Sequence, residues 1–317
     1  MAKTLNVLLT GANGYLGEHI KLLMNKLDVN LYVLNRNDIE NLINQKFFID
    51  CEIPNKFELS LLNIKFDLLI HSAAISSEDC FKYKNKIDLI NVKLTDYLSK
   101  FCQFKKIYFL FLSSVQVYGS NLTGIYDESS MINPHSLYSF SKSKAEKKVI
   151  NRFQKYSLKG SILRVGNIVG RPLNKKSSGW KLYANSTILE SVNKRIIYIK
   201  SNANIRRNFV SIKLFLEFIN YLIFTLKRDI KELPNIINIT SKKSLSLYEF
   251  AFKVKEINRI YFKKNVNIKL KNKSSDMIPY SYVANNVLSS ILTNSLNYEL
   301  DSVIYEMIKY EYDNNND

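Results

Sequence analysis

The chain has 317 residues, of which 46% are hydrophobic and 23% charged, with a formal net charge of +18. This composition is typical of a globular protein with a substantial core, and it excludes collagen-like, disordered and disulfide-framed chains. The lysines are scattered without a continuous tract, which argues against a dedicated nucleic-acid partner and suits phosphorylated small ligands equally well.

The cysteines and the hydrophobic stretches indicate a cytoplasmic protein. Cys51, Cys80 and Cys102 are an odd number with no CxxC spacing, so we expect reduced, buried thiols rather than disulfides or a zinc site. The N-terminus MAKTLNVLLTG shows no secretory signal. The most hydrophobic later stretch, at 214–226, is shorter than the roughly 20 residues of a membrane span and contains Glu217. We therefore expect no insertion into a membrane.

Short apolar runs alternate with longer amphipathic ones through the first half of the chain. Strands are predicted at residues 5–10, 31–35, 46–50, 66–71, 107–112 and 161–165. Helices are predicted at 14–27, from 38, and at 57–62, 88–104 and 136–156. This alternation predicts an α/β fold with a doubly wound parallel sheet.

Beyond residue 170 the alternation becomes irregular and helices dominate. They are predicted at 182–192, 212–226, 247–257 and 300–310, with short strands between them. We expect residues 1–170 to form the sheet domain and 171–317 a smaller C-terminal α/β lobe, with some crossing of the chain between the two. The polar, acidic tail from residue 311 is expected to fray.

Three glycines follow the first predicted strand in the segment TGANGYLG. Gly11 permits a tight turn, Gly14 lets the backbone approach a pyrophosphate, and Gly17 allows the helix to pack closely on the strand. The helix that begins here offers its N–H groups and its positive dipole end to phosphate. We therefore expect a dinucleotide-binding, Rossmann-type domain, with Tyr15 and Leu16 of the same turn also at the cofactor.

The end of the second predicted strand bears on the choice of cofactor. An acid at this place binds the adenosine 2′-hydroxyl of NAD, whereas an arginine accommodates the 2′-phosphate of NADP. The chain has Arg36 here and no carboxylate, which favours NADP(H), with NAD(H) as the alternative. Asp50, at the end of the third predicted strand, is the natural partner of the adenine amino group or a helix-capping aspartate.

Ser114 lies at the end of the strand predicted at 107–112, and YSFSK follows with Tyr138 and Lys142 four residues apart. That spacing places the phenol and the ammonium on one helical face. An ammonium beside a phenol lowers its pKa, so Tyr138 is expected to exchange a proton during hydride transfer while Ser114 holds the reacting oxygen.

At this point the chain resembles the extended short-chain dehydrogenase/reductase family, which contains nucleotide-sugar epimerases, dehydratases and reductases. The resemblance spans most of the sequence. It rests on TGANGYLG, HSAA from His71, LINVKLT around Asn91, SSVQVYG, YSFSK and LRVGNIVGRP from Leu163.

The resemblance implies roles for individual residues of the first domain. Ser114, Tyr138 and Lys142 would form the catalytic triad, with Lys142 also binding the nicotinamide ribose. Other matches suggest that Asn91 is a structural asparagine of the cofactor half and that Ala73 and Ala74 line the cofactor through their backbones. His71 ends a buried strand without a second metal ligand at suitable spacing, which favours a structural histidine.

The resemblance also implies the partners. Asn167 and Arg207 match positions that contact the diphosphate of a nucleotide-sugar substrate, although for Arg207 a solvated surface charge is an equal alternative by its charge alone. A homodimer is implied through the helices that begin near Asp88 and Ser136. The C-terminal lobe carries no recognisable nucleotide motif, so the sugar and the nucleotide are not named by the sequence.

The residues after Ser114 bear on the reaction. Dehydratases of the family carry an Asp-Glu pair here, and Val115 and Gln116 cannot exchange protons. We expect a keto-sugar reductase that uses NADPH, with an NAD-dependent 4-epimerase as the alternative. The expected context of either enzyme is the synthesis of a surface polysaccharide. A catalytically silent regulatory or RNA-associated protein is the alternative of another class.

Overall fold

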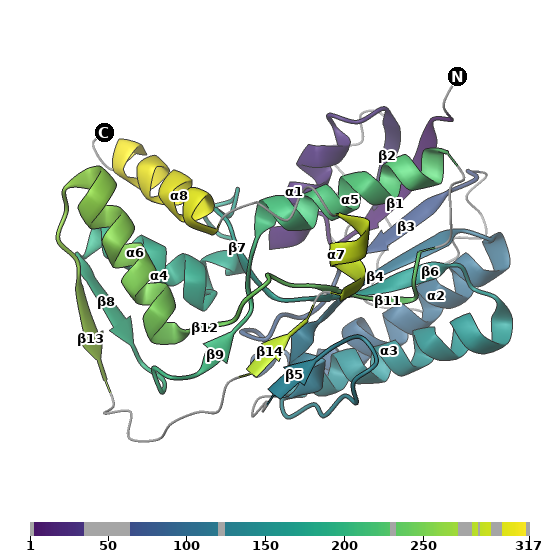
Figure 1. Ribbon diagram of the computed structural model, residues 1–317. Coiled ribbons are helices and arrows are strands. Elements are labelled where there is room, and N and C mark those ends of the chain that lie inside the picture. Colours follow the sequence, from purple (N-terminus) through teal and green to yellow (C-terminus); the bar gives the residue numbers. More distant parts are fainter. Residues whose placement is uncertain are drawn as a thin grey trace. The chain divides into compact units, whose positions relative to one another are not determined.

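The computed structural model describes residues 3–34, 64–119, 124–228, 233–271, 281–284, 286–292 and 300–314 (Figure 1). The predictions for Arg36, Asp50 and Cys51, the strand at 46–50 and the helices from 38 and at 57–62 lie outside these residues. The chain divides into two compact units. The first contains 1–120, 131–164 and 218–237, and the second contains 121–130, 165–217 and 238–317.

A six-stranded sheet forms the centre of the first unit. Its order is β11-β6-β4-β3-β1-β2, and the pairs β1–β2, β1–β3 and β3–β4 are parallel. The strands are β1 (Leu5–Thr10), β2 (Val29–Leu34), β3 (Leu68–His71), β4 (Tyr108–Ser114), β6 (Gly160–Val165) and β11 (Ile236–Ile239). Their near-continuous burial follows from helices on both faces, which require apolar side chains at successive positions. The predicted doubly wound α/β fold is confirmed.

The helices of the first unit follow the expected apolar periodicity. They are α1 (Tyr15–Met24), the 3-10 turn η3 (Lys84–Lys86), the π-helical turn η4 (Asp88–Lys93), α2 (Leu94–Lys105), the 3-10 turn η5 (Val115–Tyr118) and α3 (Leu137–Tyr156). α3 begins with a capping box. The Ser136 hydroxyl accepts a hydrogen bond from the N–H of Ser139, and the Ser139 hydroxyl accepts one from the N–H of Ser136. Leu98 of α2, Val149 of α3 and Phe109 of β4 meet in one buried cluster.

The second unit is built from helices around short paired strands. Its helices are η6 (Ser178–Lys181), α4 (Tyr183–Asn193), α6 (Leu247–Phe262), α7 (Asn286–Ile291) and α8 (Leu300–Asn314). Its strand pairs are β7 (Asn167–Val169) with β10 (Phe209–Ser211), β8 (Ile196–Ile199) with β13 (Asn267–Leu270), β9 (Arg206–Arg207) with β12 (Leu245–Ser246) and β5 (Gly124–Tyr126) with β14 (Ser281–Val283). α5 (Ile212–Lys227) begins in this unit and ends in the first.

The predicted fraying of the tail is wrong for residues 311–314. α8 continues to Asn314, because Tyr312 packs against Phe262 with ring centroids 5.1 Å apart and donates a hydrogen bond of 2.6 Å to Asn258 Oδ1. A polar tail with one well-placed aromatic side chain therefore gains enough contact to remain helical.

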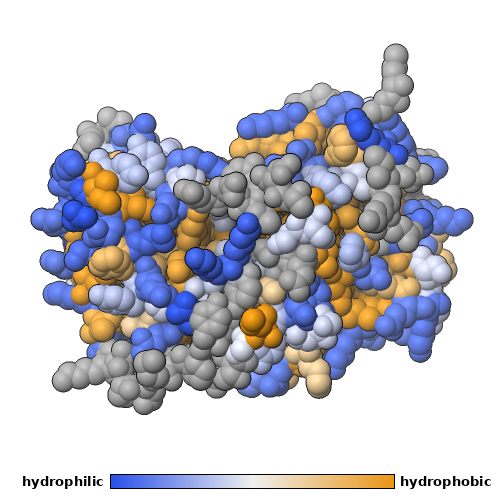
Figure 2. Space-filling view, viewed as in Figure 1, coloured by the Kyte–Doolittle hydropathy of each residue, from blue (hydrophilic) through white to orange (hydrophobic). Residues whose placement is uncertain are grey.

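The thiols and the surface agree with the composition. Cys80 and Cys102 are free and buried, as predicted. Within the described ranges, no helix is both long enough and apolar enough to cross a membrane. Figure 2 shows a face covered largely by hydrophilic residues, with hydrophobic ones visible between them.

Candidate active site

The glycine turn between β1 and α1 has the tight geometry that the sequence predicts. Gly11 has a φ of +71°, and the N–H of Gly14 donates to its carbonyl oxygen at 2.9 Å. A Cβ atom on Gly17 would lie 2.0 Å from that same oxygen, and one on Gly11 would lie 2.6 Å from the backbone nitrogen of Ala73. Side chains are thus excluded where the turn meets α1 and where it meets the end of β3.

The start of α1 fits the pyrophosphate of a dinucleotide. Gly14 occupies the N-cap position with extended backbone and makes no side-chain cap hydrogen bond, and Tyr15 and Leu16 form the first turn. The Tyr15 ring turns into the unit and packs edge-on against His19, with centroids 5.6 Å apart. The turn therefore presents glycine backbone and the positive end of the helix dipole, which are the groups that bind phosphate in this setting.

His71 fastens the neighbouring strands together rather than serving as a reactive group. Its Nδ1 lies 2.8 Å from Thr10 Oγ1 and its Nε2 lies 2.9 Å from Thr95 Oγ1. Burial, followed by the nearby Lys142 ammonium, lowers the pKa of His71 to about 3, so the ring is neutral. No group of three or more metal-binding side chains occurs within the described part of the chain. The next residues, Ala73 and Ala74, continue from this strand beside the glycine turn.

Asn91 links the cofactor side of the sheet to α3. It is buried, its Oδ1 accepts a hydrogen bond of 2.7 Å from the N–H of Ile75, and its Nδ2 donates to Ser141 Oγ at 2.9 Å. Asn91 lies in the π-helical turn η4, where the widened backbone places this side chain. These contacts agree with the structural role that the sequence resemblance implies.

Ser114 is the last residue of β4 and is nearly buried. It caps η5, since its Oγ accepts a hydrogen bond of 3.2 Å from the N–H of Gln116. Val115 and Gln116, at the positions that carry the dehydratase acid pair, form the start of this 3-10 turn.

Lys142 joins α3 to the same end of β4. It is 3% exposed, and its Nζ donates a hydrogen bond of 2.8 Å to the carbonyl oxygen of Leu112, two residues before Ser114. The ammonium lies 5.8 Å from the centroid of the Tyr138 ring and 4.8 Å from that of Phe111. The structure thus brings Lys142, Tyr138 and the end of β4 together.

The electrostatics of this site differ from the sequence-based expectation. Burial, followed by the Glu78 and Cys80 charges, raises the pKa of Tyr138, so the predicted lowering is wrong in this structure. The physical reason is that the Lys142 ammonium points to the Leu112 carbonyl while the phenol loses water. Burial lowers the pKa of Lys142 to about 8, although Glu146 and Cys80 oppose this change. At pH 7 the tyrosine is a neutral proton donor and the lysine is mostly cationic.

Asn167 and Arg207 lie close to each other in the second unit. The Asn167 N–H and its Nδ2 donate to the carbonyl oxygen of Asn208 at 2.8 and 3.4 Å, and Arg207 is the residue before it. Asn208 is buried beside β14. Its Oδ1 accepts a hydrogen bond of 3.0 Å from the N–H of Val283, and its Nδ2 donates one of 3.3 Å to the Val283 carbonyl oxygen. Arg207 is partly buried, and its positive charge acts to lower the pKa of the Tyr183 hydroxyl, against the larger effect of burial. Arg207 is therefore not a purely solvated surface charge.

Sequence reasoning missed a buried ionic cluster behind Lys142. Glu146 is fully buried and accepts hydrogen bonds from Ser113 Oγ at 2.6 Å and from Arg164 Nη2 at 2.8 Å. The signal available was the position of Glu146 one helical turn after Lys142. Its partner Arg164 lies on β6, so the spacing of residues within α3 does not reveal the ion pair.

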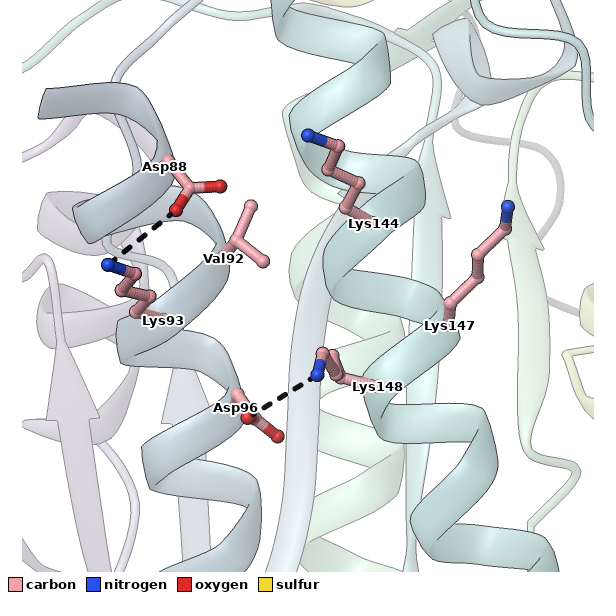
Figure 3. Close-up of a pocket in the computed structure, with 7 residues that line it drawn as sticks. All are labelled: Asp88, Val92, Lys93, Asp96, Lys144, Lys147 and Lys148. Carbon is pink, nitrogen blue, oxygen red and sulfur yellow. Dashed lines mark ion pairs between the residues drawn. The ribbon is translucent and has the colours of Figure 1, made fainter. Parts of the chain in front are cut away.

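The described hollow of about 530 Å³ lies elsewhere, between η4, α2 and α3 (Figure 3). Its lining consists of charged side chains and one valine: Asp88, Val92, Lys93, Asp96, Lys144, Lys147 and Lys148. Neither the glycine turn nor the Ser114, Tyr138 and Lys142 constellation contributes to it. The hollow is therefore a surface feature of these three helical elements, separate from the candidate site.

A family model for the NAD dependent epimerase/dehydratase family matches residues 7–239. The chain belongs to this family. The matched region includes the glycine turn, Ser114, Tyr138, Lys142 and Arg207, and it ends in β11.

Curated members of the family share about a third of the aligned residues. A dTDP-D-glucose 4,6-dehydratase of Dictyostelium discoideum is 32% identical over 194 residues, covering 52% of this chain and 44% of the relative. A putative UDP-glucose 4-epimerase of Methanocaldococcus jannaschii is 32% identical over 178 residues, covering 52% and 56%. The chain thus spans about half the length of the curated relatives that it matches.

Solved structures match over nearly the whole chain and confirm the family's fold. MoeE5 in complex with UDP-glucuronic acid and NAD superposes with a TM-score of 0.77 at 16% identity, covering 98% of this chain and 99% of the other. UDP-glucuronic acid 4-epimerase from Bacillus cereus, in complex with UDP-glucuronic acid and NAD, gives 0.76 at 20% identity, covering 97% and 100%.

Proposed function

We propose that this family member is an NAD(P)-dependent oxidoreductase of nucleotide-linked sugars. The observation that carries the proposal is the hydrogen bond from Lys142 to the Leu112 carbonyl, which fastens the helix of Tyr138 to the strand that ends in Ser114. The turn after β1, where Gly11 and Gly17 leave no room for a side chain, also supports the proposal. The diphosphate of the substrate would be met by Asn167 and Arg207.

The chain's own groups then have distinct tasks. The first turn of α1 and the backbones of Ala73 and Ala74 hold the dinucleotide, which when bound supplies or accepts the hydride. The neutral Tyr138 phenol donates its proton to the sugar oxygen as a carbonyl is reduced, and it takes a proton back in the reverse direction. Ser114 Oγ orients that oxygen, and the Lys142 ammonium stabilises the phenolate that forms.

Within this class we infer a keto-sugar reductase. A protonated Tyr138 is ready to quench the alkoxide of a reduced sugar, and Arg36 in the sequence favours NADPH. A 4-epimerase that retains NAD is the second candidate, supported by the epimerase and NAD named for the relatives and neighbours. The dehydratase named for other relatives is disfavoured here, because Val115 and Gln116 carry no carboxylate.

The test begins with cofactor binding and continues with a panel of substrates. NADPH and NAD are titrated in parallel by calorimetry into wild type and Arg36→Ala, after release of any cofactor that copurifies. UDP- and dTDP-hexoses and their 4-keto derivatives are then offered, and products are identified by NMR. Selective loss of NADPH affinity in Arg36→Ala supports the reductase, whereas retained NAD and an epimerised product support the epimerase.

Replacement of Tyr138 by Phe separates an enzyme from a silent cofactor-binding protein. Phenylalanine keeps the ring but removes the proton, so turnover should fall at least about a hundredfold while the Kd of the cofactor stays unchanged. Failure of wild type to bind either cofactor, or full turnover by Tyr138→Phe, would contradict the proposed function.

A further inference from the structure

A buried ionic cluster lies directly behind Lys142. Glu146 is one turn farther along α3 and is 0% exposed. Arg164, from β6, donates to its carboxylate through Nη2 at 2.8 Å and Nε at 3.2 Å, and through Nη1 to the Tyr118 hydroxyl at 2.9 Å. Ser113 completes the cluster with a 2.6 Å hydrogen bond from its Oγ to the other carboxylate oxygen.

Burial of this ionic cluster has a high desolvation free energy, so core stability alone does not explain it. Each ion loses its hydration, and a well-packed apolar set of similar volume is often as stable or more stable than a buried ion pair. The side chains nevertheless satisfy one another through short, charge-assisted hydrogen bonds. Hydrogen bonds also fix the orientation of the neighbouring polar groups, which apolar side chains at these positions would not do.

Those neighbours belong to the proposed catalytic site. Three successive residues of β4 connect the cluster to that site. The carbonyl of Leu112 accepts a hydrogen bond from Lys142, and the hydroxyl of Ser113 donates one to Glu146. The next residue, Ser114, is the proposed catalytic serine. Ser113 directly precedes Ser114 in β4, so the anchoring of the Ser113 side chain to Glu146 restrains the backbone that carries Ser114. α3 is thus hydrogen-bonded to the end of β4 through both Lys142 and Glu146.

We propose that Glu146, fixed by Arg164 and Ser113, is a positioning residue that holds Ser114 and the Lys142 ammonium in their working arrangement. The inference rests on the proposed function, because it assigns Glu146 to that same site.

The charges around Lys142 support this role. The groups that face its ammonium are His71 on β3, Cys80 in the loop after β3, and Tyr138 and Glu146 on α3. Burial lowers the pKa of His71 to about 3 and raises those of Cys80 and Tyr138, so these three are neutral at pH 7. Burial lowers the pKa of Lys142 to about 8, and Glu146 opposes that fall. Glu146 is the carboxylate among the groups that face the Lys142 ammonium.

The first experiment measures the ionisation of Lys142 directly and needs no substrate. Lysine labelled with ¹³C at Cε is introduced into the full chain, and the Lys142 signal is identified by its absence in Lys142→Arg. In Glu146→Gln the titration midpoint should fall by about one pH unit, the usual effect of losing a nearby opposite charge. The matched control is Asp96→Asn, which breaks the 2.6 Å ion pair between α2 and Arg152 of α3. It should leave the midpoint unchanged.

The second experiment separates positioning from charge. Ser113→Ala keeps every charge, so the Lys142 midpoint should stay while kcat falls about tenfold through misplacement of Ser114, with KM and the Kd of the cofactor unchanged. Ser113→Thr retains the hydroxyl and should restore kcat. An unchanged midpoint in folded Glu146→Gln, or a Ser113→Ala that loses thermal stability alone, would overturn the proposal.

A single removal of Glu146 leaves the Arg164 guanidinium buried without its counterion, so a folded alternative is needed. Glu146→Gln combined with Arg164→Met removes both charges, and a smaller fall in the Lys142 midpoint is expected, because the loss of the guanidinium partly offsets the loss of the carboxylate. Failure of the proposed function itself would show as absent turnover with every nucleotide sugar, while the NMR titration would still decide whether Glu146 controls Lys142. A normal midpoint in an active Glu146→Gln enzyme would refute the inference alone.

Discussion

Gly17 is the position in the glycine turn that leaves the least room for a side chain. A Cβ atom there would meet the Gly11 carbonyl oxygen at 2.0 Å, and backbone cannot move aside as a flexible side chain can. We expect Gly17→Ala to lose about 3 kcal/mol or more of unfolding free energy and to weaken cofactor binding at the displaced turn. Urea denaturation and calorimetry measure the two effects.

Asn13 provides the matched control for this substitution. It lies in the same turn and is exposed, so Asn13→Ala should change the unfolding free energy by no more than about 0.5 kcal/mol. Equal stabilities of the Gly17 and Asn13 variants would show that the close approach of α1 to the turn is not what the sequence constrains.

His71 makes stability depend on pH. Its folded pKa is about 3, against 6.5 for the ordinary imidazole, so above pH 6.5 neither state binds the proton and its contribution is fully present. Below pH 6.5 the unfolded chain takes up the proton first, and stability should fall by about 1.4 kcal/mol for each pH unit down to about pH 3. Urea denaturation from pH 7 to pH 4 measures this slope.

Replacement of His71 by Gln tests the origin of that slope. The amide can still form hydrogen bonds with Thr10 and Thr95 but does not titrate. The unfolding free energy of His71→Gln should therefore fall less steeply with decreasing pH, by the contribution of the His71 imidazole. His135→Gln, at an exposed position, is the control for the loss of an imidazole elsewhere in the chain. A slope that is steep in all three proteins would assign the acid sensitivity to other groups.

At the scale of elements, the end of α8 depends on one aromatic side chain. Tyr312→Phe keeps the packing on Phe262 and removes the hydrogen bond to Asn258, so the unfolding free energy should fall by about 1 kcal/mol. Hydrogen exchange in the last turn of α8 should accelerate. Tyr310→Phe is the control, because its ring can remain stacked on Arg171, 3.9 Å from the guanidinium carbon. Equal exchange in both variants would contradict the anchoring role of Tyr312.

The elements of the sheet were largely predictable from local patterns. The runs at 5–10, 107–112 and 161–165 correspond to β1, β4 and β6, and the helix predicted at 136–156 is α3 with its capping serine. Apolar periodicity suffices here because each strand is covered on both faces and each helix on one. The π-helical form of η4 escaped prediction, since helical periodicity alone does not distinguish the π hydrogen-bond pattern that places Asn91.

The candidate site was predictable only as far as motifs reach. Gly11, Gly17, Tyr138 and Lys142 could be named because their chemistry depends on close spacing along the chain. The Glu146 cluster could not, because its partners come from other elements and only folding brings them together. The direction of the Tyr138 pKa also failed, since the loss of water around the phenol is a property of packing and not of the YxxxK spacing.

At the scale of the whole molecule, the lysines of η4 and α3 bear on self-association. The family resemblance implies a homodimer through these helices, and the hollow between them carries Lys93, Lys144, Lys147 and Lys148 (Figure 3). Lys93 and Lys148 each approach a carboxylate only at 4.0 Å. Two copies that meet here would repel, so raising NaCl from about 50 to about 500 mM should strengthen the dimer by screening. Sedimentation equilibrium measures it.

Replacement of Lys144 and Lys147 by Gln supplies the matched control for the salt series. The double variant should dimerise more tightly at low salt and respond less to added NaCl. A wild-type dimer that weakens as salt rises would instead require attraction between opposite charges on another surface, and the implied helix contact would then be wrong.

The order of strands in the sheet has a consequence for synthesis of the chain. β6 pairs with β11 at the edge of the sheet, and β11 is made only after the segment 165–217 of the second unit. While the ribosome produces that segment, the outer edge of β6 has its backbone N–H and C=O groups open to any passing strand. The sheet therefore cannot close at β6 until the chain beyond residue 236 has left the ribosome, so the nascent protein carries an unpaired strand edge through the middle of its synthesis.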